Sequence, residues 1–145
     1  MSTWSPGSGI FGRPQVVLLR FAPWAIFQNN HPHDLMWPVE MLTAKGIAHA
    51  MGWNATVVDL HVENLQRDDL IRHLVRLRPD LLMIDTMTPT MAYAREIAGA
   101  VLDQLSDLKI WGIGQHATEQ SEDLLYPGSP ISGVLLGEYP GSMAN

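Results

Sequence analysis

The sequence predicts an α/β fold in which a five-stranded parallel sheet carries helices on both faces. Short, continuously apolar segments rich in Val, Ile and Leu alternate along the chain with longer segments whose apolar residues recur at helical spacing. Pro, Gly and polar clusters separate the two kinds of segment. Such alternation favours right-handed strand–helix–strand units, and hence a parallel sheet.

The composition is typical of one globular domain. The chain has 145 residues, of which 46% are hydrophobic and 17% charged, enough to bury a single core. A formal net charge of −6 provides no basic face for nucleic acid. No run approaches the roughly 20 apolar residues of a membrane span, and no secretory signal is recognisable, so we expect a cytoplasmic protein. The chain has no cysteine, which excludes disulfides and thiolate ligands from this sequence.

The first strand is predicted near the start of the chain. Residues 1–14, rich in Gly, Pro and Ser, are expected to form a flexible segment, and residues 15–145 the folded domain. The β-branched and apolar run at 15–21 predicts a strand buried on both faces. The irregular segment 22–37 predicts a long loop, and a long loop in so small a domain is usually functional or disordered. Its Trp and His content favours function.

Helices and strands then alternate up to the middle of the chain. Pro38 suits the first turn of a helix at 39–52, which carries an apolar stripe. Residues 55–60 predict a second strand, residues 68–78 a second helix and residues 80–85 a third buried strand.

The remaining elements follow the same order. Residues 86–90 predict a tight polar turn before a helix that continues to about Leu105. Residues 109–113 predict the fourth strand, residues 119–125 a short helix and residues 132–137 the fifth strand. Five strands with right-handed crossovers favour the flavodoxin-like order 2-1-3-4-5.

Segments of unusual composition follow four of these strands. Ligands of such sheets bind beyond the carboxyl ends of the strands, near the switch in strand order. The segments at those ends are residues 22–37, 86–90, 112–118 and 137–141, which concentrate the Trp, His, Thr and Gly residues. The coincidence predicts a ligand site at this edge of the sheet.

Two small sites fit the residues poorly. Asp85, at the end of the third strand, suits a phosphorylation receiver, but no acidic pair follows the first strand to hold Mg²⁺. Gly112 and Gly114 begin a match to G-x-G-x-x-A, although the dinucleotide fingerprint belongs to the first strand of its sheet. No Ser-His-Asp or Cys-His arrangement is visible that would indicate nucleophilic catalysis.

A metal site at His31, His33 and Asp34 remains a third alternative. These residue types can ligate zinc or iron, but a further ligand would have to come from His61 or His116 at another strand end. Loop histidines that make ordinary hydrogen bonds explain the same pattern.

Four motifs, in this order along the chain, resemble those of one known domain. Trp37-Pro38-Val39 followed by Gly52-Trp53-Asn54-Ala55-Thr56-Val57-Val58-Asp59 resembles the start of that domain, and Arg78-Pro79-Asp80-Leu81-Leu82-Met83-Ile84 with Thr88 resembles its "PDLVGIS…T" strand and turn. Gly114-Gln115-His116-Ala117-Thr118 resembles "GGPHAT", and Gly137-Glu138 resembles "GE". Together they resemble the cobalamin-binding domain of cobalamin-dependent radical SAM enzymes, and the match covers about residues 16–143. Ile113 and Gln115 stand where the family usually has glycine and proline.

The resemblance implies a domain that binds cobalamin. The cofactor would be base-off, with a cobalt that His need not ligate, because the D-x-H-x-x-G motif of the other cobalamin-binding class is absent. His116 or His33 is a possible axial ligand, but neither is favoured. The radical SAM half of the family needs a CxxxCxxC motif, so this chain is not expected to be an enzyme on its own. It would carry, store or deliver cobalamin, or serve a separate radical SAM or methyltransferase chain, and an oligomer is possible. The alternative is a flavodoxin-like enzyme or sensor that binds a nucleotide or flavin.

The resemblance also implies which residues surround the cofactor. Short polar side chains would meet the amide arms of the corrin, glycines would leave room for its nucleotide tail, and large apolar residues would contact the disc. The predicted cofactor-binding residues are Trp24, Trp37, Pro38, Thr86, Met87, Thr88, Thr90, Gly112, Gly114, Gln115, His116, Thr118, Gly137, Glu138 and Tyr139.

Overall fold

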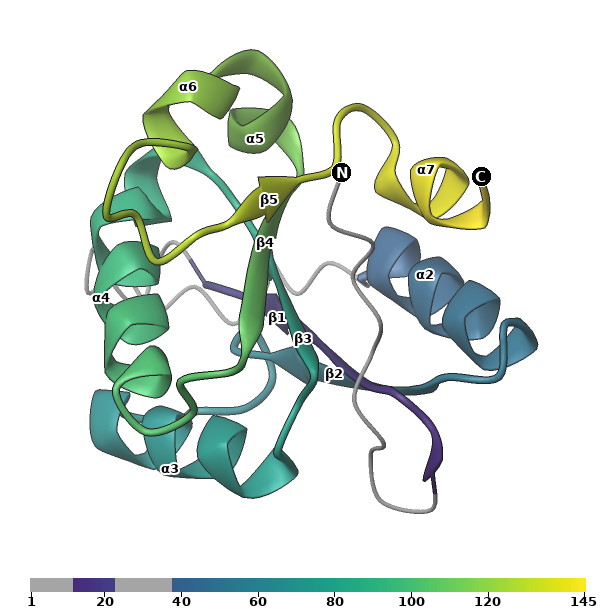
Figure 1. Cartoon of the computed structure of the whole chain (residues 1–145), viewed down its shortest axis with the longest axis horizontal. Coiled ribbons are helices and arrows are strands. Elements are labelled where there is room, and N and C mark those ends of the chain that lie inside the picture. The colour runs from purple at the N-terminus through teal and green to yellow at the C-terminus, as the bar shows by residue number, and fades with distance from the viewer. Residues whose placement is uncertain (1–11, 23–37) are drawn as a thin grey trace.

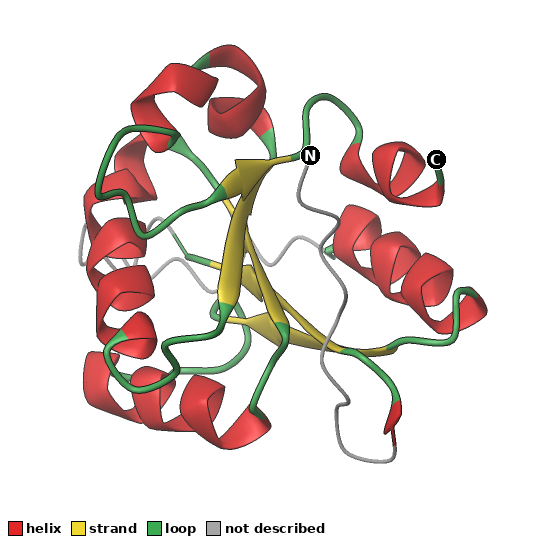
Figure 2. Ribbon diagram, in the orientation of Figure 1, coloured by secondary structure: helices red, strands yellow, loops and turns green. Residues whose placement is uncertain are grey.

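A computed structural model of the chain describes residues 12–22 and 38–145. Its elements, in chain order, are β1 (Gln15–Arg20), α2 (Val39–Ala50), β2 (Asn54–Asp59), α3 (Arg67–Leu77), β3 (Leu81–Asp85), the 3-10 helix η2 (Thr88–Thr90), α4 (Met91–Leu102), β4 (Lys109–Ile113), α5 (Gln115–Glu119), α6 (Ser121–Leu124), β5 (Gly133–Val134) and α7 (Tyr139–Ala144). Strands and helices alternate, as the sequence predicts (Figure 2).

The strands form one parallel sheet in the order β2-β1-β3-β4-β5, which confirms the predicted flavodoxin-like topology. The order reverses at β1, whose two neighbours are β2 and β3. In this register Arg20, the last residue of β1, lies opposite Asp59 of β2 and Asp85 of β3. Three neighbouring strands therefore end on charged residues at the edge where ligands of such sheets bind.

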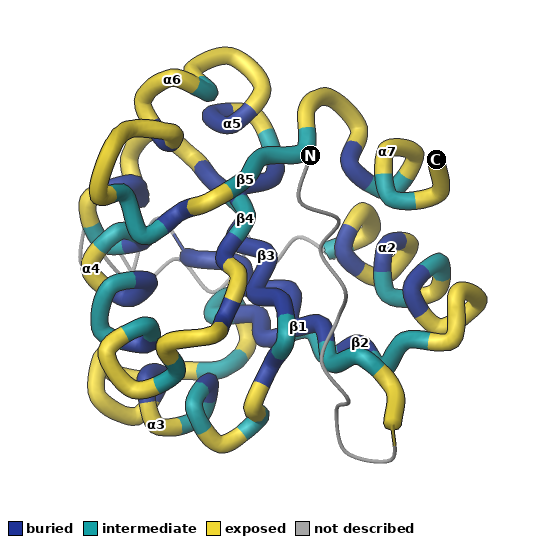
Figure 3. Tube along the Cα trace, viewed as in Figure 1, coloured by how far each residue is buried: buried dark blue, intermediate teal, exposed yellow. Residues whose placement is uncertain are grey.

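Two hydrophobic cores cover the two faces of the sheet. Helices α2 and α7 lie on one side, and α3 and α4 lie on the other (Figure 1). Successive strand residues pack alternately into the two cores: Leu18 and Met83 face α2, whereas Leu19 and Ile84 face α4. Figure 3 shows β1 and β3 buried almost throughout, β2 and β4 buried in part and β5 intermediate, with the helices buried only along the side that faces the sheet. Both-sided burial explains why the strands are continuously apolar in sequence.

The C-terminal third differs in detail from the prediction. The short helix predicted at 119–125 begins earlier, at Gln115, and is divided into α5 and α6 at Gln120, whose ψ of 40° interrupts the helix. The fifth strand is shorter than predicted, because Leu136 already lies in an exposed loop and Gly137 turns the chain with a φ of +72°. Helix α7 is not among the elements predicted from the sequence; Pro140 lies in its first turn, where a proline is tolerated.

Several predictions fall on residues outside the described part. The flexible segment at 1–14 is described only from residue 12 onward, and the loop predicted at 22–37 only at its first residue. Trp24, Trp37, His31, His33 and Asp34 therefore stay predictions. Among the described residues, no helix is long and apolar enough to cross a membrane.

Candidate functional site

The turns after β3 and β4 lie against each other at the carboxyl edge of the sheet. The Thr86 backbone N–H donates to the Ile113 carbonyl at 2.7 Å, and the His116 N–H donates to the Thr86 carbonyl at 3.1 Å. Both contacts continue the pairing of β3 with β4 beyond the ends of the strands. The structure thus brings together two of the segments that the sequence singled out.

Two of the threonines predicted to surround a cofactor, Thr86 and Thr90, are buried within the turn. Thr86 has no exposed surface; its Oγ1 donates to the Ile113 carbonyl at 2.7 Å and accepts the Ala117 N–H at 2.9 Å. Thr90 is equally buried and donates to the Met87 carbonyl at 3.0 Å. These hydroxyls satisfy buried main-chain groups, so they fix the shape of the turn.

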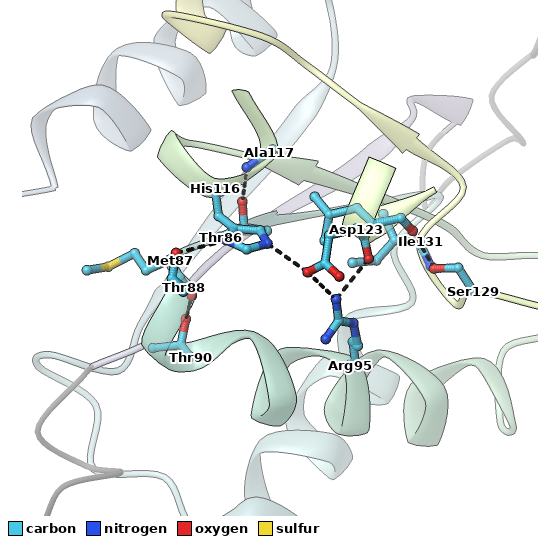
Figure 4. A network of polar contacts seen from close by, with 11 residues as sticks. Thr86, Met87, Thr88, Thr90, Arg95, His116, Ala117, Asp123, Ser129 and Ile131 are labelled. Atoms are coloured by element: carbon cyan, nitrogen blue, oxygen red, sulfur yellow. Dashed lines mark hydrogen bonds and ion pairs between the residues drawn. The ribbon is translucent and has the colours of Figure 1, made fainter. Parts of the chain in front are cut away.

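Met87 and Thr88, between these buried threonines, face outward. Met87 is 37% exposed, and its side chain extends away from the polar network in Figure 4. Thr88 is exposed, and its Oγ1 lies 2.9 Å from Nδ1 of His116. The turn therefore offers one apolar and one polar side chain to a ligand.

A chain of polar contacts continues from Thr88 away from the edge (Figure 4). His116 is 6% exposed, and its Nε2 lies 3.0 Å from Oδ2 of Asp123. Arg95 donates to the same Oδ2 at 2.6 Å and to the Asp123 carbonyl at 2.8 Å. The hydrogen bond from His116, followed by the one from Arg95, lowers the pKa of Asp123, so this carboxylate is ionised at neutral pH.

A third segment is joined to the first two by Thr118. Its Oγ1 donates to the Gly114 carbonyl at 2.9 Å and accepts the Gly137 N–H at 2.9 Å. The loop between β5 and α7 is thereby tied to the start of α5. This loop contains Leu136, which is 53% exposed, and Glu138, which is also exposed. Three predicted segments therefore converge on one edge.

The remaining predicted residues in this region have other environments. Tyr139 is almost fully buried in the core between the sheet and α2, so it presents no surface to a ligand. Burial, followed by the nearby carboxyls of Asp85 and Glu40, raises its pKa. Gln115 is exposed and donates to Glu119 at 3.2 Å. Pro38 immediately precedes α2, as predicted, and its carbonyl accepts the Leu42 N–H.

A row of charges, not predicted from the sequence, crosses the α2 side of the same edge. Arg20 and Asp59 are both nearly buried, with Arg20 Nη1 3.6 Å from Asp59 Oδ2. The His61 ring lies 3.0 Å from Arg20 Nη2 and 3.1 Å from the Phe21 carbonyl. Burial, followed by the Arg20 charge, lowers the pKa of His61. His61 thus lies at the edge of the sheet, where contacts with Arg20 and the Phe21 carbonyl hold its ring.

Asp85 ends this row on the third strand. Burial raises its pKa to about 6, with Glu40 and Asp59 adding to the effect and Arg20 opposing it. A carboxyl whose pKa is higher in the folded than in the unfolded chain holds its proton more tightly when folded. The stability of the protein should therefore fall as the pH rises from about 4 to about 6.

The glycines predicted to leave room for a nucleotide tail have three different surroundings. A Cβ on Gly112 would lie 2.9 Å from Leu124 Cδ1, and a Cβ on Gly114 would lie 2.2 Å from Asp85 Oδ1. The chain's own atoms fill the space beside these two glycines, and a role beside a tail stays a prediction for both. A Cβ on Gly137 would meet nothing within 4 Å, so this position opens on free space.

The described residues form neither a metal site nor a receiver site of their own, and the metal alternative at His31, His33 and Asp34 lies outside them. Among the described residues, no group of three or more His, Asp or Glu side chains could hold a metal ion. A receiver site would need other carboxylates close enough to Asp85 to share a Mg²⁺ ion with it. Oδ1 of Asp85 instead lies beside Gly114. Both ring nitrogens of His116 have partners within the chain, and its role toward cobalt stays a prediction.

Sequence reasoning found the turn residues but missed their partners. Asp123 and Arg95 belong to segments with no motif, and only the fold brings them to His116. One signal was available for the charge row: Arg20 is the single charge in a strand predicted to be buried on both faces.

The structure defines the chain as an open, parallel α/β sheet with a candidate ligand site at its carboxyl edge. The profile of the B12 binding domain family matches residues 31–139, and the chain belongs to this family. No curated protein sequence matches it.

Two solved radical SAM enzymes contain a similar fold. The cobalamin-dependent S-adenosylmethionine radical enzyme OxsB, with aqua-cobalamin and S-adenosylmethionine bound, matches with a TM-score of 0.68 and 15% identity over 82% of this chain and 16% of OxsB. The radical S-adenosylmethionine methyltransferase TsrM from Kitasatospora setae, with cobalamin and a [4Fe-4S] cluster bound, matches with a TM-score of 0.53 and 18% identity over 70% of this chain and 20% of TsrM. The chain therefore spans a fifth or less of either enzyme.

The side chains exposed at this edge are of the kinds that a wide disc with amide arms would contact. Met87 and Leu136 offer apolar contact, Thr88, Gln115 and Glu138 offer polar contact at the rim, and free space lies beside Gly137.

Proposed function

We propose that this domain binds cobalamin at the carboxyl edge of its sheet, against the turn that presents Met87 and Thr88. The observation that carries the proposal is that the residues of this turn differ in whether they are buried or face outward. Buried Thr86 and Thr90 are used up by main-chain hydrogen bonds, and Met87 and Thr88 are left facing outward. A pre-formed surface of this kind binds without the cost of ordering a loop.

The proposed cofactor is base-off, with no protein nitrogen on the cobalt from the described residues. The hydrogen-bonded ring of His116 supports this, because ligation through either nitrogen would break a contact with Thr88 or Asp123. When bound, cobalamin would supply methyl-transfer chemistry. The chain's own part would be to hold the disc and to exclude water from the face that it covers.

A separate catalytic chain would then use the bound cofactor. Any iron–sulfur cluster must take its thiolates from outside this sequence, because the sequence has no cysteine. Leu42 and Val39, in the first turns of α2, are exposed apolar residues. We propose that they help to contact a radical SAM or methyltransferase partner, and that the domain acts as a cobalamin carrier or subunit.

Retention of a coloured cofactor tests the binding proposal. The protein is mixed with hydroxocobalamin at micromolar concentration, desalted and examined by visible spectroscopy, with flavin mononucleotide in a parallel sample. We expect corrin bands to stay with the protein and the flavin to wash through. The opposite result would favour the flavodoxin-like alternative, and loss of both would contradict the proposal.

A pair of methionine variants locates the site. Met87→Glu places a charge where the disc is proposed to lie and should weaken binding by about tenfold, the equivalent of about 1.4 kcal/mol. Met51→Glu is the matched control, because Met51 is 48% exposed but lies at the far end of α2, before β2 begins. Equal affinities in the two variants would contradict the placement. The electron paramagnetic resonance spectrum of the Co(II) form should show no nitrogen splitting, and such splitting would contradict the proposed ligation.

A further inference from the structure

The polar chain behind Thr88 has a defined direction. Asp123 is an ionised carboxylate that also accepts a hydrogen bond from Arg95. It has no proton to donate, so in its contact with His116 it must be the acceptor. A neutral imidazole in this position carries its one proton on Nε2, 3.0 Å from Asp123 Oδ2. Nδ1 is left as an acceptor, in the same way that a carboxylate fixes the tautomer of a catalytic histidine.

The tautomer decides what Thr88 can offer. Its Oγ1 lies 2.9 Å from Nδ1, which has no proton, so the threonine hydroxyl must be the donor of this hydrogen bond. A hydroxyl has one proton and two lone pairs. With the proton directed at His116, the oxygen of this exposed residue has only lone pairs to offer at the edge of the sheet.

We propose that Asp123 and His116 hold Thr88 as a fixed hydrogen-bond acceptor, which makes Thr88 select an amide N–H of the ligand and reject a carboxylate at the same position. The inference rests on the proposed function, since the amide arms of a corrin are the groups to be selected. Thr88 is then the specificity-determining contact, and His116 and Asp123 are positioning residues.

The chemistry of the choice is one of matching donors to acceptors. An amide arm donates to the lone pairs of Thr88, whereas an ionised carboxylate has only lone pairs and would meet them unpaired. A free hydroxyl would rotate and donate to the carboxylate, so an unrestrained threonine would not discriminate. The buried ring of His116 restricts that rotation.

The experiment compares cobalamin with its monocarboxylic acid derivatives, in each of which one peripheral amide is replaced by a carboxylate. Dissociation constants are measured by equilibrium dialysis for the wild type, Thr88→Val, Thr88→Ser and His116→Gln. For at least one derivative the wild type should bind cobalamin about tenfold more tightly than the acid. Thr88→Ser should keep this ratio. Thr88→Val, which removes the hydroxyl at constant shape, and His116→Gln, which frees it, should bring the ratio close to one.

A second measurement does not depend on the ligand. Long-range proton–nitrogen NMR correlations of the imidazole should show His116 as the Nε2–H tautomer at neutral pH. The Nδ1–H tautomer would overturn the inference, because Thr88 would then accept from the ring and donate outward.

The outcomes separate the inference from the proposed function. If the wild type retains cobalamin but the variants leave the ratio within twofold of its wild-type value, cobalamin binding stands and the selection by Thr88 is wrong. A merely structural His116 would give that result, together with a lower melting temperature for His116→Gln. If the wild type retains neither cobalamin nor the acids, both proposals fail.

Discussion

Gly114 should tolerate no side chain, and Gly114→Ala is the substitution that tests this. The backbone there has φ of +91° and ψ of −164°, a region that is essentially restricted to glycine and costs another residue about 1–3 kcal/mol. The new Cβ would also lie 2.2 Å from Asp85 Oδ1 and 3.4 Å from the Thr86 carbonyl. The carboxylate can rotate away, so overpacking adds only about 1–2 kcal/mol, toward the low end of its usual range. The sum is about 2–5 kcal/mol.

Urea unfolding followed by circular dichroism measures this loss. For a domain of this size it corresponds to a fall in melting temperature of roughly 5–15 °C. Gly99→Ala is the matched control: Gly99 lies within α4, a Cβ there would meet nothing within 4 Å, and the exchange should stabilise the helix by up to about 1 kcal/mol.

A double-mutant cycle with Asp85→Ala separates the two causes. Without the carboxylate, Gly114→Ala should cost only the backbone strain, so the coupling energy should be about 1–2 kcal/mol. An unfolding midpoint for Gly114→Ala equal to that of the wild type would refute the reasoning. If Gly114→Ala cost the same free energy with and without Asp85→Ala, the contact with Asp85 would not contribute to the loss.

Three further predictions concern the interior of the same edge. Asp85→Asn removes a carboxyl whose pKa is raised to about 6, so it should stabilise the protein by up to about 3 kcal/mol at pH 7.5 but not near pH 4. Urea titrations of the variant and the wild type at both pH values measure this, and the same difference in unfolding free energy at both would contradict it. Thr86→Val leaves the buried Ala117 N–H without its partner, while the Ile113 carbonyl keeps the hydrogen bond from the Thr86 N–H, so the variant should cost about 1–3 kcal/mol in urea unfolding, whereas Thr86→Ser should recover most of the loss; an equal cost for both would mean that packing, not the hydroxyl, matters. Gly112→Ala should cost about 1–3 kcal/mol, and less in a Leu124→Ala background, because its Cβ would lie 2.9 Å from Leu124; strict additivity of the two thermal shifts would contradict that contact.

The sequence predicted the fold because the information is local. Continuous apolar runs such as Leu81–Asp85 and a helical stripe such as that of α4 each identify one element, and chirality then fixes the order of the strands. The same reasoning placed Met87 and Thr88 at the edge, since the residues after a parallel strand must emerge there. The family resemblance added the cofactor, and the match to the B12 binding domain family confirms the family.

The surroundings of individual side chains were not predictable in this way. Thr86 and Thr88 are alike in sequence, yet one is buried against the main chain and the other is exposed. Asp123 contacts His116 across the interruption between α5 and α6 at Gln120, which has no sequence signal. The crowding beside Gly112 and Gly114 likewise depends on side chains distant in sequence. Such contacts are set by register and packing between elements, which a single sequence does not specify.

The carboxylate–histidine pair at this edge has a form familiar from metal sites. A histidine that ligates a metal usually donates its other ring N–H to a carboxylate, which orients the ring and raises the basicity of the ligating nitrogen. Asp123 and His116 have that relation, but the basic Nδ1 faces a threonine hydroxyl, not open space. The same arrangement that would strengthen a cobalt ligand is therefore directed at Thr88. His116 cannot both ligate cobalt through Nδ1 and hold Thr88 as a hydrogen-bond acceptor. The electron paramagnetic resonance spectrum of the Co(II) form and the ratio of the affinities for cobalamin and its carboxylic acids therefore test the same geometry independently.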